Sequence, residues 1–304
     1  MFARPRRRAL LFLLRATSTL SSTGSCSESL APQSYTLLAK RRLSPDSFLL
    51  HFSFGRRILG DDPALPTCIK VVFPNGTDAK TGAPRSLEKS YSPVSHPATE
   101  GVLDLVVKSY PPRPGGGVGS YLCELEPGQA MSATLKSQRL MHGDASVSRR
   151  WANLGLVGGG TGIAPLLQIA RIVLDDPEDT SRVSILSINR REEDILAREE
   201  LERLAASHPG RLSLSFSLTS PPAGWGGHAG RGSLAMVRDA LPPPTGDGTT
   251  QILVCGTDGF VATWGGPVGR APPLPDGSKG PKVQGPLLGL LADAGFVASE
   301  VFKY

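Results

Sequence analysis

The sequence predicts two domains of different fold class, an antiparallel β-barrel or sandwich followed by an α/β domain with a parallel sheet. Its 304 residues suit two domains, each large enough to enclose a hydrophobic core. In residues 33–148, apolar side chains recur at every second position of short runs, which is the period of a half-buried strand. In residues 149–304, strand-like and helix-like runs alternate instead, starting with a strand, a glycine-rich turn and a helix.

The period of two is clearest in residues 46–54, where Phe48, Leu50, Phe52 and Phe54 fall on one face. Glycine, proline and asparagine clusters separate this run from two further β-rich runs, at residues 68–73 and 102–110. Several short strands with turns between them predict an antiparallel barrel or sandwich, and the pattern does not choose between the two.

The second half has the order of βαβ units. Strands are predicted at residues 182–188, 211–218 and 251–254, and helices at residues 195–207 and 233–241. Such an order produces a parallel sheet covered by helices, with ligands bound outside the carboxyl ends of the strands. The glycine-rich turn and the pair Cys255-Gly256 both follow strands, so we expect them at that edge. A Pro/Gly-rich insertion at residues 265–285 is predicted to be a surface loop.

The glycine-rich turn lies in the stretch 153–174, NLGLVGGGTGIAPLLQIARIVL. Gly158, Gly159 and Gly160 allow positive φ and a close approach to a ligand. The N-terminus of the following helix offers free N–H groups to a phosphate, and Pro165 suits a first helical turn. The alternative is a tight strand-to-helix turn that binds nothing.

The positive charge is concentrated at the N-terminus. The formal net charge is +6, from 33 basic and 27 acidic residues. Five arginines precede the first acidic residue, Glu28, and without them the count is 28 against 27, a net of +1. These are Arg4, Arg6, Arg7, Arg8 and Arg15. The remainder of the chain therefore has no basic excess that would indicate nucleic-acid binding.

Residues 1–32 have the composition of a targeting leader that is cleaved or disordered, since they are rich in Arg, Ser and Thr. The apolar run at residues 9–14 is far shorter than the ~20 residues that span a membrane. We expect a mitochondrial transit peptide. A secretory signal and a disordered basic tail are the alternatives.

Cysteine and histidine spacing predicts no metal site. Cys26, Cys68, Cys123 and Cys255 form no C-x-x-C pair, and the five histidines form no H-E-x-x-H motif. The same spacing predicts no redox-active cysteine pair.

The spelling GGGTGIAPLLQ at residues 158–168 resembles the pyridine-nucleotide loop of the ferredoxin–NADP reductase superfamily, and most of all the GGTGITP loop of the NADH–cytochrome b5 reductase family. The resemblance implies an N-terminal FAD-binding β-barrel, residues 33–148, and a C-terminal NAD(P)H-binding α/β domain, residues 149–304. It assigns the dinucleotide loop to Gly158, Gly159, Gly160, Thr161 and Gly162, with Thr161 among the catalytic residues. Ala164 stands where the family often has a second threonine.

Three stretches of the first domain resemble the flavin motifs of that family. Lys89-Ser-Tyr-Ser-Pro-Val-Ser95 is similar to R-x-Y-[ST]-P-x-S. By this likeness Tyr91 packs along the flavin, the catalytic Ser92 bonds near its N5 atom, and Lys89 meets the phosphate. Ser90 is a further cofactor contact. Lys89 replaces an arginine and supplies one movable charge in place of a forked contact, so Arg85 is a candidate helper. Taken alone, the stretch is equally a turn after a strand.

The second stretch, Asp104-Leu-Val-Val-Lys-Ser-Tyr110, is similar to D-L-V-I-K-V-Y. It implies that the Val106 and Val107 backbone lines the flavin, that Lys108 lies near the ring or the nicotinamide, and that Tyr110 is a cofactor contact. The third stretch, GGGVGSYL at residues 115–122, is similar to G-G-x-x-S. It assigns the FAD pyrophosphate to Gly117, Val118, Gly119 and Ser120. An exposed strand lysine and a flexible linker are the alternatives.

Two stretches of the second domain complete the resemblance. Ile188-Asn-Arg-Arg-Glu-Glu-Asp-Ile-Leu196 is similar to A-N-x-T-E-x-D-I-L and makes Asn189 a cofactor contact. The run CGTDGFV takes the place of C-G-P-P-x-M. It implies that catalytic Cys255 packs beside nicotinamide C4 and that the cofactor also meets Gly256, Thr257 and Asp258. Gly226 stands where many family members have an acidic residue that favours NADH, so NADPH is not excluded. The overall likeness to the family implies NADH.

The resemblance implies a flavoenzyme that takes a hydride from NADH and passes single electrons to cytochrome b5 or a similar carrier. An NADPH-linked reductase of ferredoxin, a quinone or another acceptor is the first alternative, and a nucleotide-binding module without catalysis is the second. The end of the chain, from Val283, resembles the mitochondrial branch of the family. We therefore expect a mitochondrial protein, peripheral to a membrane if it meets one, and monomeric.

Overall fold

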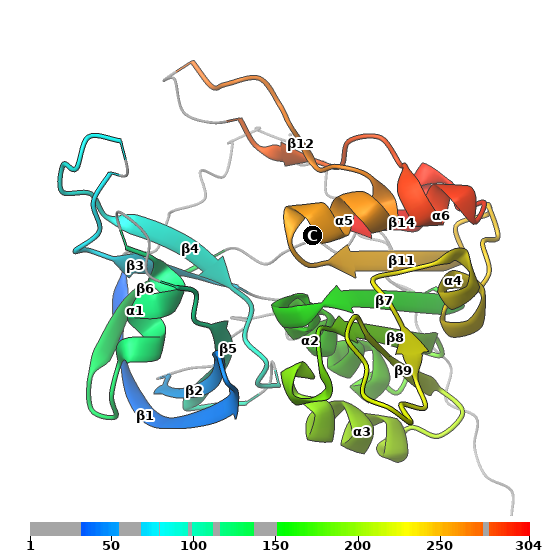
Figure 1. Ribbon diagram of the computed structural model, residues 1–304, viewed down its shortest axis with the longest axis horizontal. Coiled ribbons are helices and arrows are strands. Elements are labelled where there is room, and N and C mark those ends of the chain that lie inside the picture. Colours follow the sequence, from blue (N-terminus) through cyan, green and yellow to red (C-terminus); the bar gives the residue numbers. More distant parts are fainter. Residues whose placement is uncertain are drawn as a thin grey trace, which may run out of the picture.

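The computed structural model describes residues 32–54, 68–78, 80–96, 99–111, 116–136, 151–275 and 280–304, which form two sheets side by side (Figure 1). The predicted leader, apart from Pro32, and the predicted boundary at residues 148 and 149 lie outside the described residues. No helix in the described part is both long and apolar enough to cross a membrane.

The first sheet has six antiparallel strands in the order β4-β3-β6-β1-β2-β5. They are β1 (Gln33–Ser44), β2 (Ser47–Ser53), β3 (Ile69–Phe73), β4 (Leu87–Tyr91), β5 (Val102–Lys108) and β6 (Ala130–Leu135). The amide of Val94, just beyond β4, donates to the carbonyl of Asp104 in β5 (2.8 Å), so the two edges of the sheet meet. Of the two predicted architectures, barrel and sandwich, this contact confirms the barrel.

The alternating phenylalanine pattern fixes which face of β2 is buried. Leu50, Phe52 and Phe54 are at most 1% exposed and belong to the barrel core, while Phe48 packs at its margin. The opposite face carries His51, whose Nδ1 lies 2.5 Å from Oδ1 of Asp104 on β5. Helix α1 (Val118–Glu124) closes the barrel with Val118 and Leu122.

The second sheet has six parallel strands in the order β10-β9-β8-β7-β11-β14. They are β7 (Asn153–Gly159), β8 (Arg182–Asn189), β9 (Leu212–Leu218), β10 (His228–Ala229), β11 (Thr250–Cys255) and β14 (Val301–Lys303). The helices are α2 (Ile163–Asp175), α3 (Arg198–Ser207), α4 (Leu234–Ala240), α5 (Asp258–Gly265) and α6 (Gly289–Asp293), with single 3-10 turns at Gly160–Gly162, Glu192–Asp194 and Ala298–Glu300.

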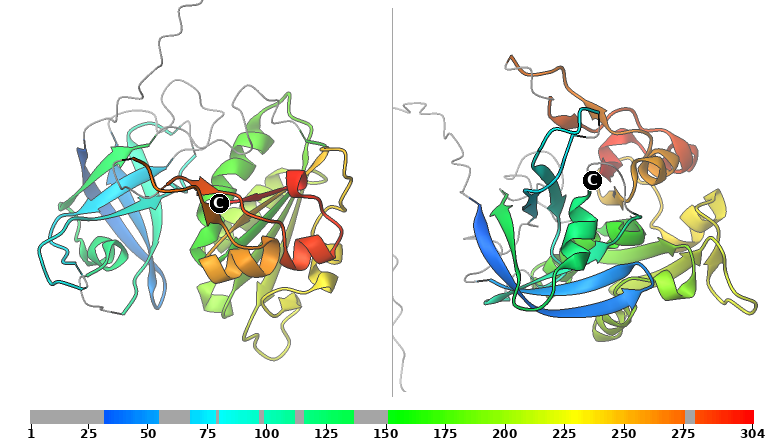
Figure 2. Two further views of the ribbon diagram at one scale, coloured as in Figure 1. Left: turned by 90° about the horizontal axis from the view of Figure 1, so that it is seen from above. Right: turned by 60° about the vertical axis from the view of Figure 1, so that its left-hand side comes forward.

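Helices cover both faces of the parallel sheet (Figure 2). Helices α2 and α3 pack with one core cluster, and α4, α5 and α6 pack with the other. The predicted helix at residues 195–207 is wrong over its first three residues, because Ala197 has a left-handed backbone (φ 54°) and α3 starts after it. This one break in the helical pattern has no glycine to signal it.

The predicted loop at residues 265–285 contains a small hairpin of β12 (Gly269–Arg270) and β13 (Lys282–Val283), which projects from the parallel sheet (Figure 1). Its base is held by the ammonium of Lys303, which is 4% exposed. This ammonium donates to the carbonyls of Pro267 (3.1 Å), Gly285 (3.4 Å) and Pro286 (2.9 Å). Burial lowers the pKa of Lys303, and the three carbonyls partly replace the water that the ammonium has lost.

The two domains share a packed interface. Val94 and Val106 of the barrel belong to the same core cluster as Ile163, Leu166 and Leu167 of α2. At its margin, Nε2 of His96 lies 2.8 Å from a carboxylate oxygen of Asp175, at the end of α2. Helix α2 is therefore one of the elements of the second domain that pack against the barrel.

Candidate active site

The predicted dinucleotide residues meet at one edge of the parallel sheet. Gly158 pairs with Cys255 on β11, and Gly159 pairs with Ile188 on β8, next to Asn189. The chain runs from β7 to β8 on one side and returns to β11 on the other, so the order of strands reverses at β7. Ligands of open α/β sheets bind at such a switch point.

The second glycine loop, residues 158–162, is shaped by contacts with β11 and α5. A Cβ built on Gly162 would lie 2.1 Å from the carbonyl oxygen of Cys255, and one on Gly159 would lie 2.8 Å from the ring of Phe260. Gly160 has φ +53° and nothing within 4 Å of a built Cβ. The loop is therefore packed tightly against the sheet on one side and open above Gly160. Thr161 lies half-buried at this opening.

The CGTD stretch ends β11 and starts α5. The hydroxyl of Thr257 accepts a hydrogen bond from the amide of Phe260 (3.3 Å), so Thr257 caps the helix that Asp258 begins. The family has prolines at these two positions, and the structure shows that the replacements form a regular helix start. Cys255 and Gly256 are half-buried at the same edge.

Asn189 is 5% exposed at the end of β8. Its Nδ2 donates to Oγ of Ser187 (3.1 Å), but its Oδ1 has no hydrogen-bond partner among the described residues. A buried acceptor without a donor is costly. A ligand with hydroxyl or amide donors would satisfy it.

The first glycine loop, residues 116–120, includes the first three residues of α1 and lies beside β4 and β5. A Cβ built on Gly119 would lie 2.7 Å from the carbonyl oxygen of Lys108 and 3.6 Å from the hydroxyl of Tyr91. Gly116 has φ +78° and faces the ring of Phe73. This brings three predicted flavin motifs together at one end of the barrel.

Tyr91 is half-buried, and its hydroxyl is shielded from solvent without a hydrogen-bond partner in the described part of the protein. Burial, with smaller effects of Cys123 and Tyr110, raises the pKa of Tyr91, so the hydroxyl stays protonated. The ammonium of Lys89 lies 5.4 Å from the centre of the Tyr91 ring and 5.6 Å from that of Tyr110. The hydroxyl of Tyr91 and the exposed Lys89 therefore place a hydrogen-bond donor and a positive charge at this end of the barrel.

Several predicted contacts already have protein partners. Lys136 donates to Oγ of Ser90 (3.3 Å), and Oγ of Ser120 donates to the carbonyl of Tyr110 (3.1 Å). The candidate helper Arg85 pairs with Asp78 (3.1 Å). Ser92 is half-buried, whereas the side chains of Val106 and Val107 are buried in the domain interface and the barrel core.

Lys108 forms an ion pair with Asp46 in the turn between β1 and β2 (2.8 Å). Partial burial of the Asp46 carboxylate opposes its charged form, but hydrogen bonds and charge from Lys108, Ser44 and Ser47 outweigh this, and the pKa of Asp46 is lowered. Local sequence patterns could not predict this ion pair, because Asp46 lies far from Lys108 in the chain. The predicted approach of Lys108 to the ring or the nicotinamide stays a prediction.

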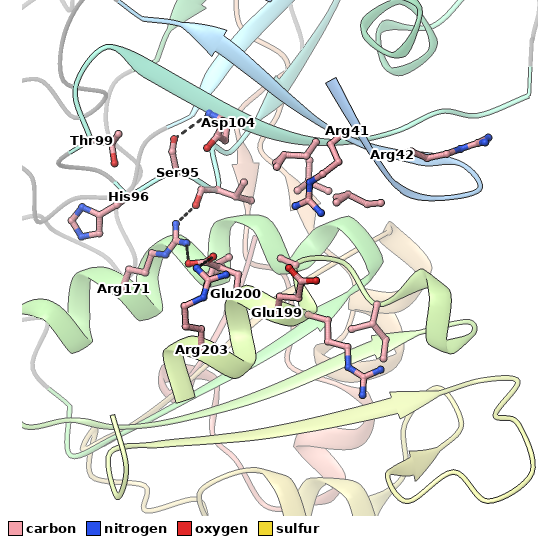
Figure 3. Close-up of a pocket in the computed structure, with 18 of the residues that line it drawn as sticks. Arg41, Arg42, Ser95, His96, Thr99, Asp104, Arg171, Glu199, Glu200 and Arg203 are labelled. Carbon is pink, nitrogen blue, oxygen red and sulfur yellow. Dashed lines mark hydrogen bonds and ion pairs between the residues drawn. The ribbon is translucent and has the colours of Figure 1, made fainter. Parts of the chain in front are cut away.

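A cavity of about 610 Å³ lies between the domains, on the side of α2 and α3 (Figure 3). The barrel lines it with residues such as Arg41 and His96, and α3 lines it with residues such as Glu199 and Arg203. Among the predicted site residues only Val106 lines this cavity, so it is separate from the two glycine loops.

The residues at the glycine loops fit the cofactors that the resemblance implied. Two shielded polar atoms, the Tyr91 hydroxyl and Asn189 Oδ1, lack partners in the described part of the chain. Glycine stands at each point where a side chain would meet the backbone of the neighbouring strand, at Gly119 and Gly162. The Tyr91 hydroxyl can donate to a ligand acceptor, and Asn189 Oδ1 can accept from a ligand hydroxyl or amide. The glycine-lined helix starts suit phosphate, so a dinucleotide, which carries all of these groups, fits the site.

Comparison with known proteins gives one family model for each sheet. Residues 69–135 match the oxidoreductase FAD-binding domain, and residues 156–264 match the oxidoreductase NAD-binding domain. The chain is 30% identical over 269 residues to an NADH-cytochrome b5 reductase-like protein of Arabidopsis thaliana, covering 86% of this chain and 74% of that protein. It is 36% identical over 193 residues to human NADH-cytochrome b5 reductase 2, covering 58% of this chain and 69% of that protein.

Among solved structures, the cytochrome b5 reductase domain of Ulva prolifera nitrate reductase has the same fold, with a TM-score of 0.67 and 23% identity over 90% of this chain and 97% of that one.

Proposed function

Because this chain belongs to the NADH–cytochrome b5 reductase family, we propose that it carries electrons from NADH through FAD to cytochrome b5. The observation that carries the proposal is the presence of both oxidoreductase domains in one chain, each matching one sheet of the structure. The names of its relatives supply the donor and the acceptor.

On the barrel side, the chain would hold FAD with Lys89 and the first glycine loop at its phosphates and with Tyr91 and Ser92 along its ring. FAD, when bound, supplies the chemistry that accepts two electrons and releases them singly. The pKa of Tyr91 is raised, so its hydroxyl can donate a hydrogen bond at any physiological pH. The exposed ammonium of Lys89 adds charge attraction to phosphate.

On the parallel-sheet side, the second glycine loop, Asn189 and the run from Gly256 to Asp258 would hold the dinucleotide. Thr161 and Cys255 lie on either side of Gly162, whose contact with the Cys255 carbonyl keeps the loop and β11 together. Their role is to orient the nicotinamide and to exclude water from the space between the domains. The Cys255 thiol acts here as a packing group and takes no part as a nucleophile.

An NADPH-linked reaction is the second candidate, and one observation favours it. Gly226 is exposed, and a built Cβ there would meet nothing within 4 Å, so the position adds neither charge nor bulk against a ribose phosphate. Arg231 is exposed nearby in the chain, while His228 lies 3.2 Å from Asp239. The overall likeness to NADH-dependent relatives makes NADH the donor that we propose.

We propose further that the protein is delivered to mitochondria. The arginine-rich composition of residues 1–32 supports delivery. Fusing these residues to a fluorescent protein should place it in mitochondria. A fusion in which the five leader arginines are replaced by glutamine should stay outside, and secretion of the intact fusion would overturn the proposal.

The reductase proposal is tested on the purified full-length chain under anaerobic conditions. Its visible spectrum should show oxidised flavin that bleaches within seconds of adding NADH and more slowly with NADPH. Cytochrome b5 added afterwards should be reduced. A flavin that stays oxidised with both donors would contradict the proposal, and faster bleaching by NADPH would select the second candidate.

A further inference from the structure

Two side chains of helix α2 donate hydrogen bonds to the barrel segment that follows Ser92. Nε2 of Gln168 donates to the carbonyl of Pro93 (3.4 Å). The guanidinium of Arg171 donates to the carbonyl of Val94 (Figure 3). Gln168 and Arg171 are three positions apart, so they lie on the same face of the helix. They hold two consecutive carbonyls of another domain, and we call them the α2 clamp.

The clamp is itself held in place. The guanidinium of Arg171 also donates to the carboxylate of Glu200 on α3, whose other oxygen pairs with Arg203 (2.8 Å). The side chain of Arg171 is 12% exposed, whereas that of Arg203 is 65% exposed. Gln168 is fully buried. A shielded, charge-assisted contact is stronger and less mobile than one in water.

The gripped segment is fixed to the barrel on its other side. The amide of Val94 donates to the Asp104 carbonyl (2.8 Å), and the amide of Asp104 donates to Oγ of Ser95 (3.2 Å). Val94 also packs in the core cluster of α2 together with Val106. The segment beyond Ser92 is therefore bound by β5 and by α2 at the same residues.

We propose that Gln168 and Arg171 are positioning residues that set the distance between the two cofactor sites. Helix α2 begins directly after the second glycine loop, and the segment that it grips begins directly after Ser92. The clamp thus joins the loop assigned to the nicotinamide dinucleotide to the segment assigned to the flavin. Transfer between two bound groups falls steeply when their separation changes, so a rigid link of this kind controls its rate. The role of the clamp in transfer rests on the proposed function.

Arg171→Ala and Arg203→Ala form a matched pair for the test. Both remove one arginine from Glu200 and leave it the other, but only Arg171→Ala releases the barrel carbonyl. In the full-length protein without added cofactor, amide hydrogen exchange at Val94 and Asp104 should become about tenfold faster in Arg171→Ala. Arg203→Ala should stay within twofold of the wild type. Equal exchange in the two variants would overturn the clamp.

With FAD and NADH bound, the rate of flavin bleaching at saturating NADH should fall about 10- to 100-fold in Arg171→Ala, at unchanged flavin content. Reoxidation of the reduced flavin by ferricyanide, which does not use the nicotinamide site, should stay within twofold. Arg171→Lys should restore only part of the rate. Its single ammonium can reach the Val94 carbonyl or the Glu200 carboxylate, but it cannot span both as the guanidinium does. Bleaching as fast as in Arg203→Ala, or equal slowing of bleaching and reoxidation, would overturn the positioning role.

Gln168→Leu serves as a second variant if Arg171→Ala does not fold, because it keeps the buried volume and removes the bond to Pro93. It should slow bleaching and speed exchange at Val94 in the same direction. A wild-type flavin that NADH fails to bleach would contradict the proposed function alone, since the exchange measurement tests the clamp without any donor.

Discussion

The two glycine loops occupy equivalent places, each between a strand and a helix, but different neighbours constrain them. The second loop is enclosed by the chain around it, because Gly162 abuts the Cys255 carbonyl and Gly159 abuts Phe260. It continues into α2, a helix of 13 residues with a largely buried face. The first loop includes the start of α1, which has seven residues, and there Gly119 lies against the backbone carbonyl of Lys108.

This difference indicates how each site is stabilised. The second loop is held by its own sheet, so its shape should be present before any ligand binds. The first loop depends on a short helix and on Tyr91, whose hydroxyl lacks a partner in the described residues. We therefore expect changes in the second loop to act first on protein stability, and changes in the first loop to act first on FAD affinity.

Gly162→Ala should have the largest effect. The new methyl group would lie 2.1 Å from a backbone carbonyl that cannot move without displacing β11. We expect a loss of about 3 kcal/mol or more in the free energy of unfolding, measured by urea denaturation, together with loss of bleaching by NADH. Gly160→Ala is the control, since its φ of +53° costs about 1–2 kcal/mol but the methyl group meets open space. Equal losses in the two variants would contradict the enclosed loop.

Gly119→Ala should come next and should separate the two loops. Alanine normally favours a helix over glycine, so a loss here reports the contact with the Lys108 carbonyl at 2.7 Å. We expect FAD affinity to fall about tenfold or more, with a loss of about 1–3 kcal/mol in stability. Titration of the FAD-free protein with FAD measures the affinity. Gly128→Ala, with φ +93° and no neighbour within 4 Å, should leave FAD affinity unchanged. Tight FAD binding by Gly119→Ala would show that the first loop is not a cofactor cradle.

Substitutions of Lys89 should change FAD affinity less than Gly119→Ala does, and they can change it in either direction. Lys89→Ala should weaken FAD binding by about 1–2 kcal/mol through the lost charge, and Lys89→Arg should strengthen it severalfold through a forked contact with phosphate. Both shifts should shrink at high salt, because Lys89 is exposed. Identical FAD affinities in the wild type and in Lys89→Ala would remove Lys89 from the phosphate site.

Substitution of Glu300 changes stability at a place outside both loops. It should have the smallest effect on the binding of either cofactor. Its buried carboxylate accepts from the amides of Thr245, Gly246 and Val297 (2.8, 2.7 and 3.1 Å). Burial opposes its charge, but these bonds and that of the Thr245 hydroxyl outweigh it and lower its pKa below the ordinary 4.5. A lowered pKa contributes stability that is present above 4.5 and is lost as the pH falls through the folded value.

Glu300→Gln should therefore cost about 1–3 kcal/mol at neutral pH, and the difference from the wild type should shrink as the pH falls below 4.5. Thermal unfolding at a series of pH values measures this. Glu126→Gln is the control, because that carboxylate is 68% exposed in an ion pair with Lys40 and should change stability by less than about 0.5 kcal/mol. A difference that does not depend on pH would contradict the charged state of Glu300.

Patterns that are local in the chain predicted the fold well. The run at residues 46–54 became β2 with the expected buried face, and residues 251–254 became the buried β11 within one residue at each end. The glycine loop between β7 and α2 was predictable because periodicity, glycine and the helix start all lie within one short stretch. Several elements were not predicted individually, namely β1, β6, β14, α5 and α6. Short β10 and the hairpin of β12 and β13 were also missed, because two-residue strands have no period.

The contacts that link the domains could not be predicted in this way. Arg171 and Val94 are 77 residues apart in the chain, and an arginine on a helix resembles any solvated polar residue. The ion pair of Asp46 with Lys108 and the enclosure of Lys303 by three carbonyls also join distant segments. Spacing identifies which residues share an element, but it does not identify which elements come to lie together.

The contact of Gly162 with Cys255 also constrains the order in which the protein can assemble. Strand β11 pairs with β7, although β8, α3, β9 and α4 lie between them in the chain. Such long-range pairing forms late, because closing the intervening chain costs entropy before any contact compensates for it. The second glycine loop reaches its final shape only when β11 is in place. A dinucleotide should then bind only chains whose parallel sheet is complete, and by mass action it should draw newly made protein toward that state.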